Sequence, residues 1–428
     1  MRTPTTFRLQ HQRGGVSIQV LVLMVPVFFG LMGFAVDLGR LYMARGELQT
    51  AAQSMALAAA GRLNGTEIAA TDALDAANRM VENESGYGNR YDYGGLTIGE
   101  TTGSLNSEIV APTYFATAAE AIGEDATATG SGEVSGIEAR HVRVELVGEA
   151  PLLFWRFLSL GQEGKVPIRV RAVAGFSAPL CTVCNIEPIA IAALDIADTV
   201  DFGYVVGTRY TLGYSCTGNP IPQALADTAQ RVPYLLLNRA NDQLTVYADD
   251  SQQLYRVGAQ GLLPSTTQAL ACFSVNTEES IWASAAPLAC NTNRVNTAIT
   301  SYLCGMATRM DATLAQGCAD IPEVDTLGTL YQSDTDLNDI VEYSAYIGNG
   351  RRLLTVPIVD ALNPTGTMIV QGFRQFILQP LQNQTGIASN DPNGRIAVTY
   401  LGTVFPIKQG RFGDCAITNG PGKVVLHR

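Results

Sequence analysis

The clearest pattern of residues that could do chemistry is Cys181-Thr182-Val183-Cys184. Two cysteines at this spacing are typical of a redox pair or of one half of a zinc site. No second pair with this spacing follows, so the pattern does not supply the other ligands of a zinc site. We therefore expect structural disulfides, and Cys181 and Cys184 are close enough in sequence for a local bridge with each other.

Histidine is scarce in this protein: the 428 residues include His11, His141 and His427. Serine and cysteine nucleophiles usually need a histidine base, so the scarcity argues against a hydrolase. His141 lies in a segment with strand-like alternation, and His427 lies in the tail. The sequence therefore predicts no catalytic residue and no cofactor.

An acidic segment places Asp334, Asp336 and Asn338 at the first, third and fifth positions of a calcium-binding loop. The sixth position is Asp339 instead of glycine, and the twelfth is Ala345 instead of glutamate, which excludes an EF-hand. A looser calcium site is one interpretation. We favour a solvated acidic loop that caps the following helical stretch, and we assign no metal site.

All cysteines of the protein follow residue 180, and their number is even. This distribution is typical of disulfides formed in an oxidising compartment, although the pairing does not follow from the sequence. The candidates are Cys181, Cys184, Cys216, Cys272, Cys290, Cys304, Cys318 and Cys415.

The net charge of −11 is unevenly distributed along the sequence. Arg2, Arg8 and Arg13 are the charged residues before Asp37, and the remainder of the sequence is acidic. That remainder has no lysine or arginine cluster of the kind that binds phosphate backbones, which argues against nucleic-acid binding. A hydrophobic content of 46% is enough for large buried cores.

Residues 14–36 form an uncharged, apolar run of 23 residues. As a helix this run is about 34 Å long, and the hydrocarbon core of a bilayer is about 30 Å thick. The helical pattern continues after the run without a cleavage site, so we expect a retained transmembrane helix. Pro26 is expected to kink it, and Asp37 is expected to be solvated where the helix leaves the bilayer. The preceding arginines predict a cytoplasmic N-terminus.

After this span the helix continues with Leu41, Leu48 and Met55 spaced seven residues apart. The spacing produces a narrow apolar stripe that must pack against something. Its partner is either another helix in an assembly or the folded domain of the protein itself, and the second is commoner for so short a stripe.

The rest of the sequence predicts an α+β fold. A break at residues 64–66 precedes a second helix at 68–82, and residues 151–158 are expected to form a packing helix. Alternation of apolar residues predicts strands around 142–146 and 166–170. Further predicted elements are a helix at 293–304, strands at 353–359, 367–370, 375–378 and 395–404, and a turn at 391–394.

The predicted architecture is one N-terminal transmembrane helix that extends into a long amphipathic helix, followed by β-rich extracytoplasmic domains. Disulfides brace the second of these domains. The predicted division is a cytoplasmic N-terminus at 1–13, a transmembrane helix at 14–36, a helical stalk at 37–85, an α+β region at 86–177 and a cysteine-containing α+β domain at 178–428.

Three parts of the N-terminal sequence form a pattern: Gly14-Gly15-Val16 with the apolar span that contains Pro26, then Ala35-Val36-Asp37-Leu38-Gly39-Arg40-Leu41-Tyr42, and then Glu47-Leu48-Gln49-Thr50-Ala51-Ala52-Gln53-Ser54-Met55-Ala56-Leu57-Ala58-Ala59-Ala60. This pattern resembles the N-terminus of TadG-like proteins, which belong to the TadE/TadG group of Flp pilus assembly, the tight-adherence (Tad) system. A weaker similarity follows in residues 154–158 and 166–176.

The resemblance implies a non-enzymatic component of Tad pilus assembly or secretion in a bacterial inner membrane, with most of the protein in the periplasm. Its implied partners are the lipid bilayer, pilins and other Tad membrane proteins. An alternative is a tethered extracytoplasmic enzyme or ligand-binding protein that shares the TadG-like anchor alone.

Two features depart from some relatives. A prepilin peptidase cuts those relatives after a glycine, with glutamate five residues later, whereas a cut after Gly14 or Gly15 here would place Gln19 or Val20 there. The Asp-x-Ser-x-Ser start of a von Willebrand A-like metal site is also absent from the sequence.

Overall fold

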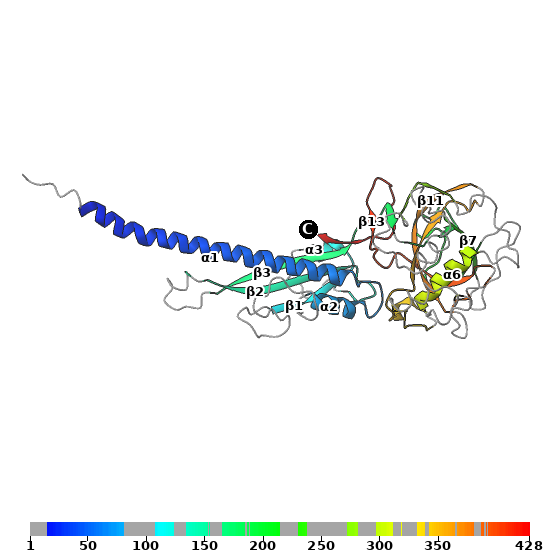
Figure 1. The fold of residues 1–428 in the computed structure, drawn as a ribbon, viewed down its shortest axis with the longest axis horizontal. Coiled ribbons are helices and arrows are strands. Elements are labelled where there is room, and N and C mark those ends of the chain that lie inside the picture. Colours follow the sequence, from blue (N-terminus) through cyan, green and yellow to red (C-terminus); the bar gives the residue numbers. More distant parts are fainter. Residues whose placement is uncertain are drawn as a thin grey trace, which may run out of the picture. The chain divides into compact units, whose positions relative to one another are not determined.

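The fold of the protein is α+β, as predicted, with one long N-terminal helix and a β-rich remainder (Figure 1). It divides into two compact units, one of residues 1–56, 77–112 and 143–172 and one of residues 57–76, 113–142 and 173–428. The predicted domain boundaries at residues 13, 36, 85 and 177 stay a prediction. The computed structural model describes residues 15–80, 108–123, 134–152, 154, 165–184, 186–187, 189–214, 230–237, 272–280, 297–310, 318, 332–338, 342–363, 366–380, 387–388, 391 and 393–428.

The N-terminal helix α1 runs from Gly15 to Ala60, with Pro26 inside it. Because a helix rises 1.5 Å per residue, it is about 69 Å long. The backbone then turns at Gly65, whose φ of +82° favours glycine. The predicted second helix follows as α2 (Ala69–Arg79), with Asp72 in its first turn and Arg79 in its last, as the helix dipole favours.

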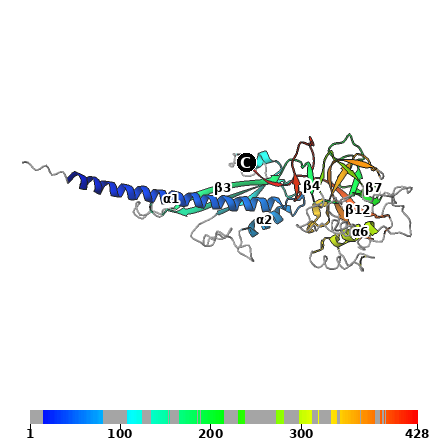
Figure 2. The same ribbon diagram turned by 45° about the horizontal axis from the view of Figure 1, so that its top comes forward.

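A four-stranded sheet has the strand order β1-β2-β3-β14. Its strands are β1 (Glu108–Phe115), β2 (His141–Pro151), β3 (Lys165–Phe176) and β14 (Val424–His427). The alternation that predicted β2 and β3 is confirmed, since Val142, Val144 and Leu146 are buried. The last strand of the protein, β14, pairs antiparallel with β3, which the sequence did not predict. In both Figures 1 and 2 the second half of α1 runs beside β2 and β3.

A larger sheet has the order β10-β5-β7-β6-β12-β11-β9, and a further pairing of β10 with β11 closes six of its strands into a ring. Inward-facing apolar side chains of these strands form the main core together with one face of a helix, α6. The elements are β5 (Ile189–Ala192), β6 (Arg209–Tyr214), β7 (Gln230–Leu236), β9 (Glu278–Ser280), α6 (Thr297–Met310), β10 (Leu353–Val359), β11 (Thr367–Gln379) and β12 (Ile396–Gly402).

A small sheet of order β13-β4-β8 shares a second apolar core with the outward-facing side chains of the ring. Val183 and Phe273 come from this sheet, and Val370 and Phe373 come from β11. The remaining described elements are α3 (Ala118–Ile122), β4 (Thr182–Cys184), β8 (Cys272–Ser274), the 3₁₀ turn η3 (Tyr343–Ala345) and β13 (Gly410–Arg411).

Most predicted elements of the second half are confirmed. β10 has its predicted bounds, β12 and α6 overlap their predictions, and Gly394 in the predicted turn has a φ of +59°. The separate strands predicted at 367–370 and 375–378 are wrong, because β11 is continuous. Gly372 and Arg374 interrupt its apolar pattern, yet Arg374 is fully buried. Most of the predicted helix at 151–158 lies outside the described residues; Pro151 ends β2.

Candidate functional site

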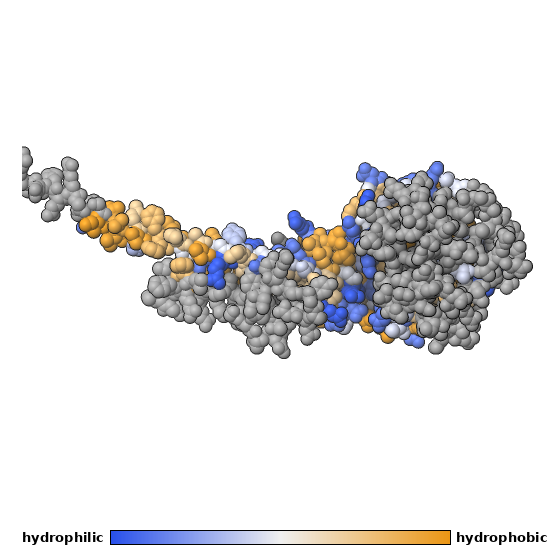
Figure 3. Space-filling model, viewed as in Figure 1, coloured by the Kyte–Doolittle hydropathy of each residue, from blue (hydrophilic) through white to orange (hydrophobic). Residues whose placement is uncertain are grey.

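The first half of α1 has an apolar surface that the protein itself leaves uncovered. Its large apolar side chains from Ile18 to Val36 are exposed, and Figure 3 shows apolar residues along this part of the helix. Within the described residues, α1 is the one helix that is long and apolar enough to cross a membrane. Because its backbone polar groups are satisfied within the helix, such a segment is stable in lipid. The helix thus fits a single-pass membrane anchor that precedes most of the protein.

The second half of α1 carries the predicted stripe, and the structure places its three residues differently. Leu48 and Met55 are buried, and Leu41 is half-buried. The Cδ1 atom of Leu48 lies 2.8 Å from the position that a β-carbon on Gly148 of β2 would occupy. Leu48 therefore packs on the protein's own sheet. Contact of the stripe with other helices stays a prediction.

A second contact joins α1 to the same sheet through polar groups. The Nε2 amide of Gln49 donates a hydrogen bond of 3.0 Å to the backbone carbonyl of Arg171 on β3. Gln49 neighbours Leu48, so the hydrogen bond and the apolar contact together fix the rotation of the helix on the sheet. This part of α1 serves as a structural element of the folded protein.

The prediction that Asp37 is solvated is wrong. Its side chain is buried, and its Oδ2 atom accepts a hydrogen bond of 3.0 Å from the backbone N–H of Phe154. The ring of Phe154 also lies over Gly33, one helical turn before Asp37 on the same face. Asp37, the first residue after the uncharged run, is thus hydrogen-bonded to Phe154, which follows β2 in the sequence.

Within the part of the chain that the structure describes, three disulfides brace the C-terminal half of the protein. They join Cys181 to Cys415, Cys184 to Cys272 and Cys304 to Cys318. None of these six cysteines is free; Cys216 and Cys290 lie outside the described residues.

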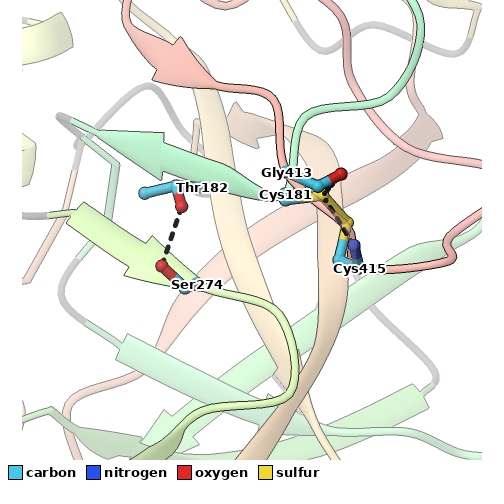
Figure 4. The surroundings of a disulfide bond; sticks show 5 residues. All are labelled: Cys181, Thr182, Ser274, Gly413 and Cys415. Atoms are coloured by element: carbon cyan, nitrogen blue, oxygen red, sulfur yellow. Dashed lines mark hydrogen bonds between the residues drawn. A yellow bond between two sulfur atoms is a disulfide. The ribbon is translucent and has the colours of Figure 1, made fainter.

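The local bridge considered between Cys181 and Cys184 is not formed. Cys184 ends β4, and residues three apart in an extended strand have Cα atoms about 10 Å apart, beyond the reach of a disulfide. Figure 4 shows that Cys181 is instead bonded to Cys415. The backbone N–H of Cys415 also donates a hydrogen bond of 3.3 Å to the Sγ atom of Cys181. Between β4 and β8, the hydroxyl groups of Thr182 and Ser274 are 2.8 Å apart. These bonds fix the small sheet and the C-terminal segment to one another.

The acidic segment at 334–338 is not the solvated loop that we expected. Asp334 and Asp336 are buried, and their carboxylates accept hydrogen bonds from other groups of the protein. The hydroxyl of Tyr346 donates to Asp334, and the backbone N–H of Ile347 donates to Asp336 at 3.1 Å. Burial raises the pKa of Asp334 above its usual value. These side chains organise a loop, and no group of three or more His, Cys, Asp or Glu among the described residues has the arrangement of a metal site.

Buried arginines are a further feature, one that sequence reasoning missed. Arg374 is fully buried, and its guanidinium donates to the carbonyls of Val200 and Thr199 at 2.8 and 3.0 Å. Its charge lies over the ring of Phe202, 4.4 Å from the centroid, which favours a cation. Burial lowers the pKa of Arg374. A local signal exists, namely an arginine inside an apolar strand, but it does not identify the partner carbonyls.

Another buried charge forms an ion pair. The Arg309 guanidinium of α6 contacts the carboxylate of Glu187, and both side chains are about 5% exposed or less. Arg309 also donates to the carbonyls of Arg351 and Leu353 at 3.2 Å each. This pair fixes α6 to the segment before β5.

Two histidines that are far apart in sequence are neighbours in the four-stranded sheet. The rings of His141 and His427 are 5.0 Å apart between centroids. A β-carbon on Gly175 of β3, the strand between β2 and β14, would be 2.2 Å from the His141 ring, so glycine leaves the space that His141 fills. The Nδ1 atom of His141 is 3.3 Å from the carbonyl oxygen of Ala116.

These features define a class of protein in which one long N-terminal helix that fits a membrane anchor is followed by disulfide-braced α+β structure. A family model described as "Putative Flp pilus-assembly TadE/G-like" matches residues 14–62, which cover α1 and the two residues after it. The match confirms the predicted resemblance for this part of the sequence and supports a role related to Flp pilus assembly. Among curated proteins and solved structures, no match to the protein was found.

Proposed function

We propose that the protein is a non-enzymatic, membrane-anchored component of a Tad/Flp-type machine for pilus assembly or secretion. The observation that carries the proposal is the coincidence of the family match at 14–62 with the uncovered apolar half of α1. Apolar side chains on such a helix require lipid or other membrane helices as neighbours. The anchor is therefore also a surface on which helices of an assembly can pack.

The proposed location is the inner membrane of a bacterium, with residues 1–13 in the cytoplasm and residues 37–428 in the periplasm. The arginines at positions 2, 8 and 13 support this orientation, because basic residues next to a span stay on the cytoplasmic side. The disulfides also support it, because they persist in the oxidising periplasm.

The proposed partners are the lipid bilayer, pilins and other Tad assembly proteins of the membrane, and no nucleic acid. Membrane helices are proposed to pack on the exposed half of α1. We propose that Leu41, Leu48 and Met55 pack the second half of α1 against the four-stranded sheet of the same protein, because Leu48 contacts Gly148 of that sheet. The disulfide-braced domain is proposed to contact periplasmic parts of the same machine.

The test is the amount of pilin on the cell surface and in the fraction sheared from cells. Four strains are compared: wild type, a clean deletion, the deletion complemented with the intact gene, and the deletion complemented with a variant whose residues 14–36 are replaced by an unrelated transmembrane helix of equal length. Immunoblots of membrane fractions establish that both complementing proteins reach equal levels.

We expect surface pilin to be lost on deletion and restored by the intact protein, but not by the variant with the foreign helix. Restoration by both proteins would show that α1 is a tether and that the assembly contacts lie in residues 37–428. Unchanged surface pilin in the deletion strain would refute the assembly function, and the tethered enzyme or ligand-binding protein would then be tested by small-molecule binding to the intact protein.

A further inference from the structure

The segment that follows β2 meets α1 inside the stretch that is long and apolar enough to cross the membrane. Phe154 makes both contacts: its backbone N–H donates to Asp37 at 3.0 Å, and its Cβ and ring atoms lie 2.8 Å from where a β-carbon on Gly33 would be. Gly33 is buried, although the large apolar side chains around it are exposed. The contact is therefore specific to one face of the span.

The position of this contact along the helix places it at the edge of the hydrocarbon core. Gly33 precedes Asp37 by four residues, which corresponds to about 6 Å along the helix axis. Asp37 is the first charged residue after the span, and an acid at that point lies near the boundary between lipid tails and headgroups. A residue packed on Gly33 must lie at the same depth as Gly33.

The side chain of Phe154 has the chemistry that this depth requires. It is 45% exposed, and Phe34, which neighbours Gly33 on the helix, is 60% exposed. An aromatic ring left uncovered by protein is unfavourable in water and favourable among acyl chains. The hydrogen bond from the Phe154 backbone also satisfies the Asp37 carboxylate, which reduces the free energy needed to place this charge next to lipid.

We propose that Phe154 is a second membrane contact of this protein: it enters the lipid interface beside α1 and sets the depth and rotation of the anchor. The occupant of this surface is the bilayer, because the contact continues the apolar surface of the span. The inference rests on membrane anchoring by α1, which is part of the proposed function.

The experiment uses the full-length protein in vesicles of phosphatidylethanolamine and phosphatidylglycerol. Single cysteines are introduced as Phe34→Cys, Phe154→Cys and Phe412→Cys and are labelled with a nitroxide; the protein without an added cysteine gives the background. Phe412 is 52% exposed and lies far from α1 in the sequence, on the segment after β13. Collisions of each label with oxygen, which concentrates in lipid, and with a water-soluble nickel chelate are measured by electron paramagnetic resonance.

We expect the label at position 154 to behave like the label at 34, with frequent oxygen collisions and a loss of nickel collisions relative to position 412. Frequent nickel collisions at 154 would place Phe154 in water and overturn the inference. Infrequent collisions with both reagents would show that protein covers Phe154, which also overturns it. A label at 34 that collides with the nickel chelate would instead refute the membrane anchor itself, so the two failures are distinguishable.

Two leucine substitutions provide a matched pair in the helix. A β-carbon at Gly33 would lie 2.8 Å from the β-carbon of residue 154, whereas a β-carbon at Gly30 would meet no atom within 4 Å. Both Gly33→Leu and Gly30→Leu make the span more apolar. We expect Gly33→Leu to raise nickel collisions at position 154 and Gly30→Leu to leave them unchanged. Equal collision rates with the nickel chelate at position 154 in the two variants would contradict the proposed contact of Phe154 with Gly33.

Discussion

The side chain of Leu48 on α1 occupies the space that Gly148 leaves open on β2. A β-carbon at position 148 would lie 2.8 Å from Cδ1 and 3.4 Å from Cδ2 of Leu48. Contacts this short do not occur between packed carbon atoms, because their optimal separation is about 3.5–4.0 Å. The absence of a side chain at 148 thus determines how closely the helix approaches the strand.

Gly148→Ala is therefore expected to destabilise the protein. Forcing one additional carbon into a closely packed contact typically costs about 1–3 kcal/mol. The measurement is the midpoint of thermal unfolding of the full-length protein in detergent micelles, followed by circular dichroism. A midpoint equal to that of wild type would show that the helix and the strand can move apart without loss.

Two glycines on the same helix serve as controls for this substitution. Neither Gly39 nor Gly46 would bring a β-carbon within 4 Å of another atom. Alanine in a helix is favoured over glycine by about 0.5–1 kcal/mol, so Gly39→Ala and Gly46→Ala are expected to leave stability unchanged or to raise it. The contrast separates the contact at Gly148 from a general effect of alanine.

The ion pair between Arg309 and Glu187 predicts non-additive substitutions. Both side chains are buried, so removing one partner leaves an uncompensated charge, which typically costs about 3–5 kcal/mol. Arg309→Met and Glu187→Gln are each expected to lower the free energy of unfolding by about that amount, as measured by chemical denaturation.

The double variant Arg309→Met/Glu187→Gln is expected to lose less than the sum of the two single losses, because neither charge then remains buried alone. Additive losses would show that the two groups stabilise the fold independently. Arg395 and Asp391 form a comparison pair, since the Arg395 side chain is 25% exposed and its removal is expected to cost less.

Features that depend on local pattern could be predicted from the sequence. The uncharged run predicted the first half of the long helix α1, and the alternation of Val142, Val144 and Leu146 predicted β2. Of the three residues in the seven-residue spacing, Leu48 and Met55 are buried and Leu41 is half-buried, and packing of this stripe in an assembly stays a prediction. In each case the signal is contained within a few turns or one strand, where backbone geometry determines which side chains share a face.

Features that join distant segments could not be predicted, because no local pattern specifies a partner. Arg374 binds carbonyls at Thr199 and Val200, more than 170 residues earlier. Cys181 pairs with Cys415 across a sequence separation of 234, although Cys184 is much nearer in sequence. The extended geometry of β4 excludes the near pairing, but the strand itself is only three residues long and carries little sequence signal.

The disulfide pairing can be tested directly. Digestion of the unreduced protein followed by mass spectrometry is expected to yield peptides linked through Cys181–Cys415, Cys184–Cys272 and Cys304–Cys318. A peptide linked through Cys181 and Cys184 would contradict the structure.

Removing one disulfide by substitution tests what it contributes. Cys181→Ser/Cys415→Ser is expected to lower the free energy of unfolding by about 2–5 kcal/mol, because the bond restricts a long loop in the unfolded state. Cys304→Ser/Cys318→Ser is the matched control. Its bond closes a loop with a sequence separation of 14, so a smaller loss is expected on the same account. Equal losses of unfolding free energy in the two variants would show that contacts of the disulfides in the folded state matter more for stability than the length of the loop that each one closes.

The pair of His141 and His427 predicts a loss of stability in mild acid. Burial lowers the pKa of His141, and the charges of His427 and Arg140 lower it further, whereas hydrogen bonds that the ring makes to the backbone of Ala116 and Phe176 raise it. Above about pH 6.5, the usual histidine pKa, the side chain is neutral in the folded and the unfolded state and its titration has no effect on stability. As the pH falls through that value, the unfolded state takes up the proton first, so the folded state loses stability until the pH is below the lowered pKa.

The measurement is the free energy of unfolding between pH 7.5 and pH 5, together with hydrogen exchange of the amides of β14, which carries His427 beside β3. We expect stability to fall in this range by about 1.4 kcal/mol for each unit by which the pKa is lowered, and the β14 amides to exchange faster. His141→Gln keeps a polar side chain but does not titrate, so its profile is expected to be flatter than that of wild type. A profile that His141→Gln leaves unchanged would show that groups other than His141 determine the response to acid.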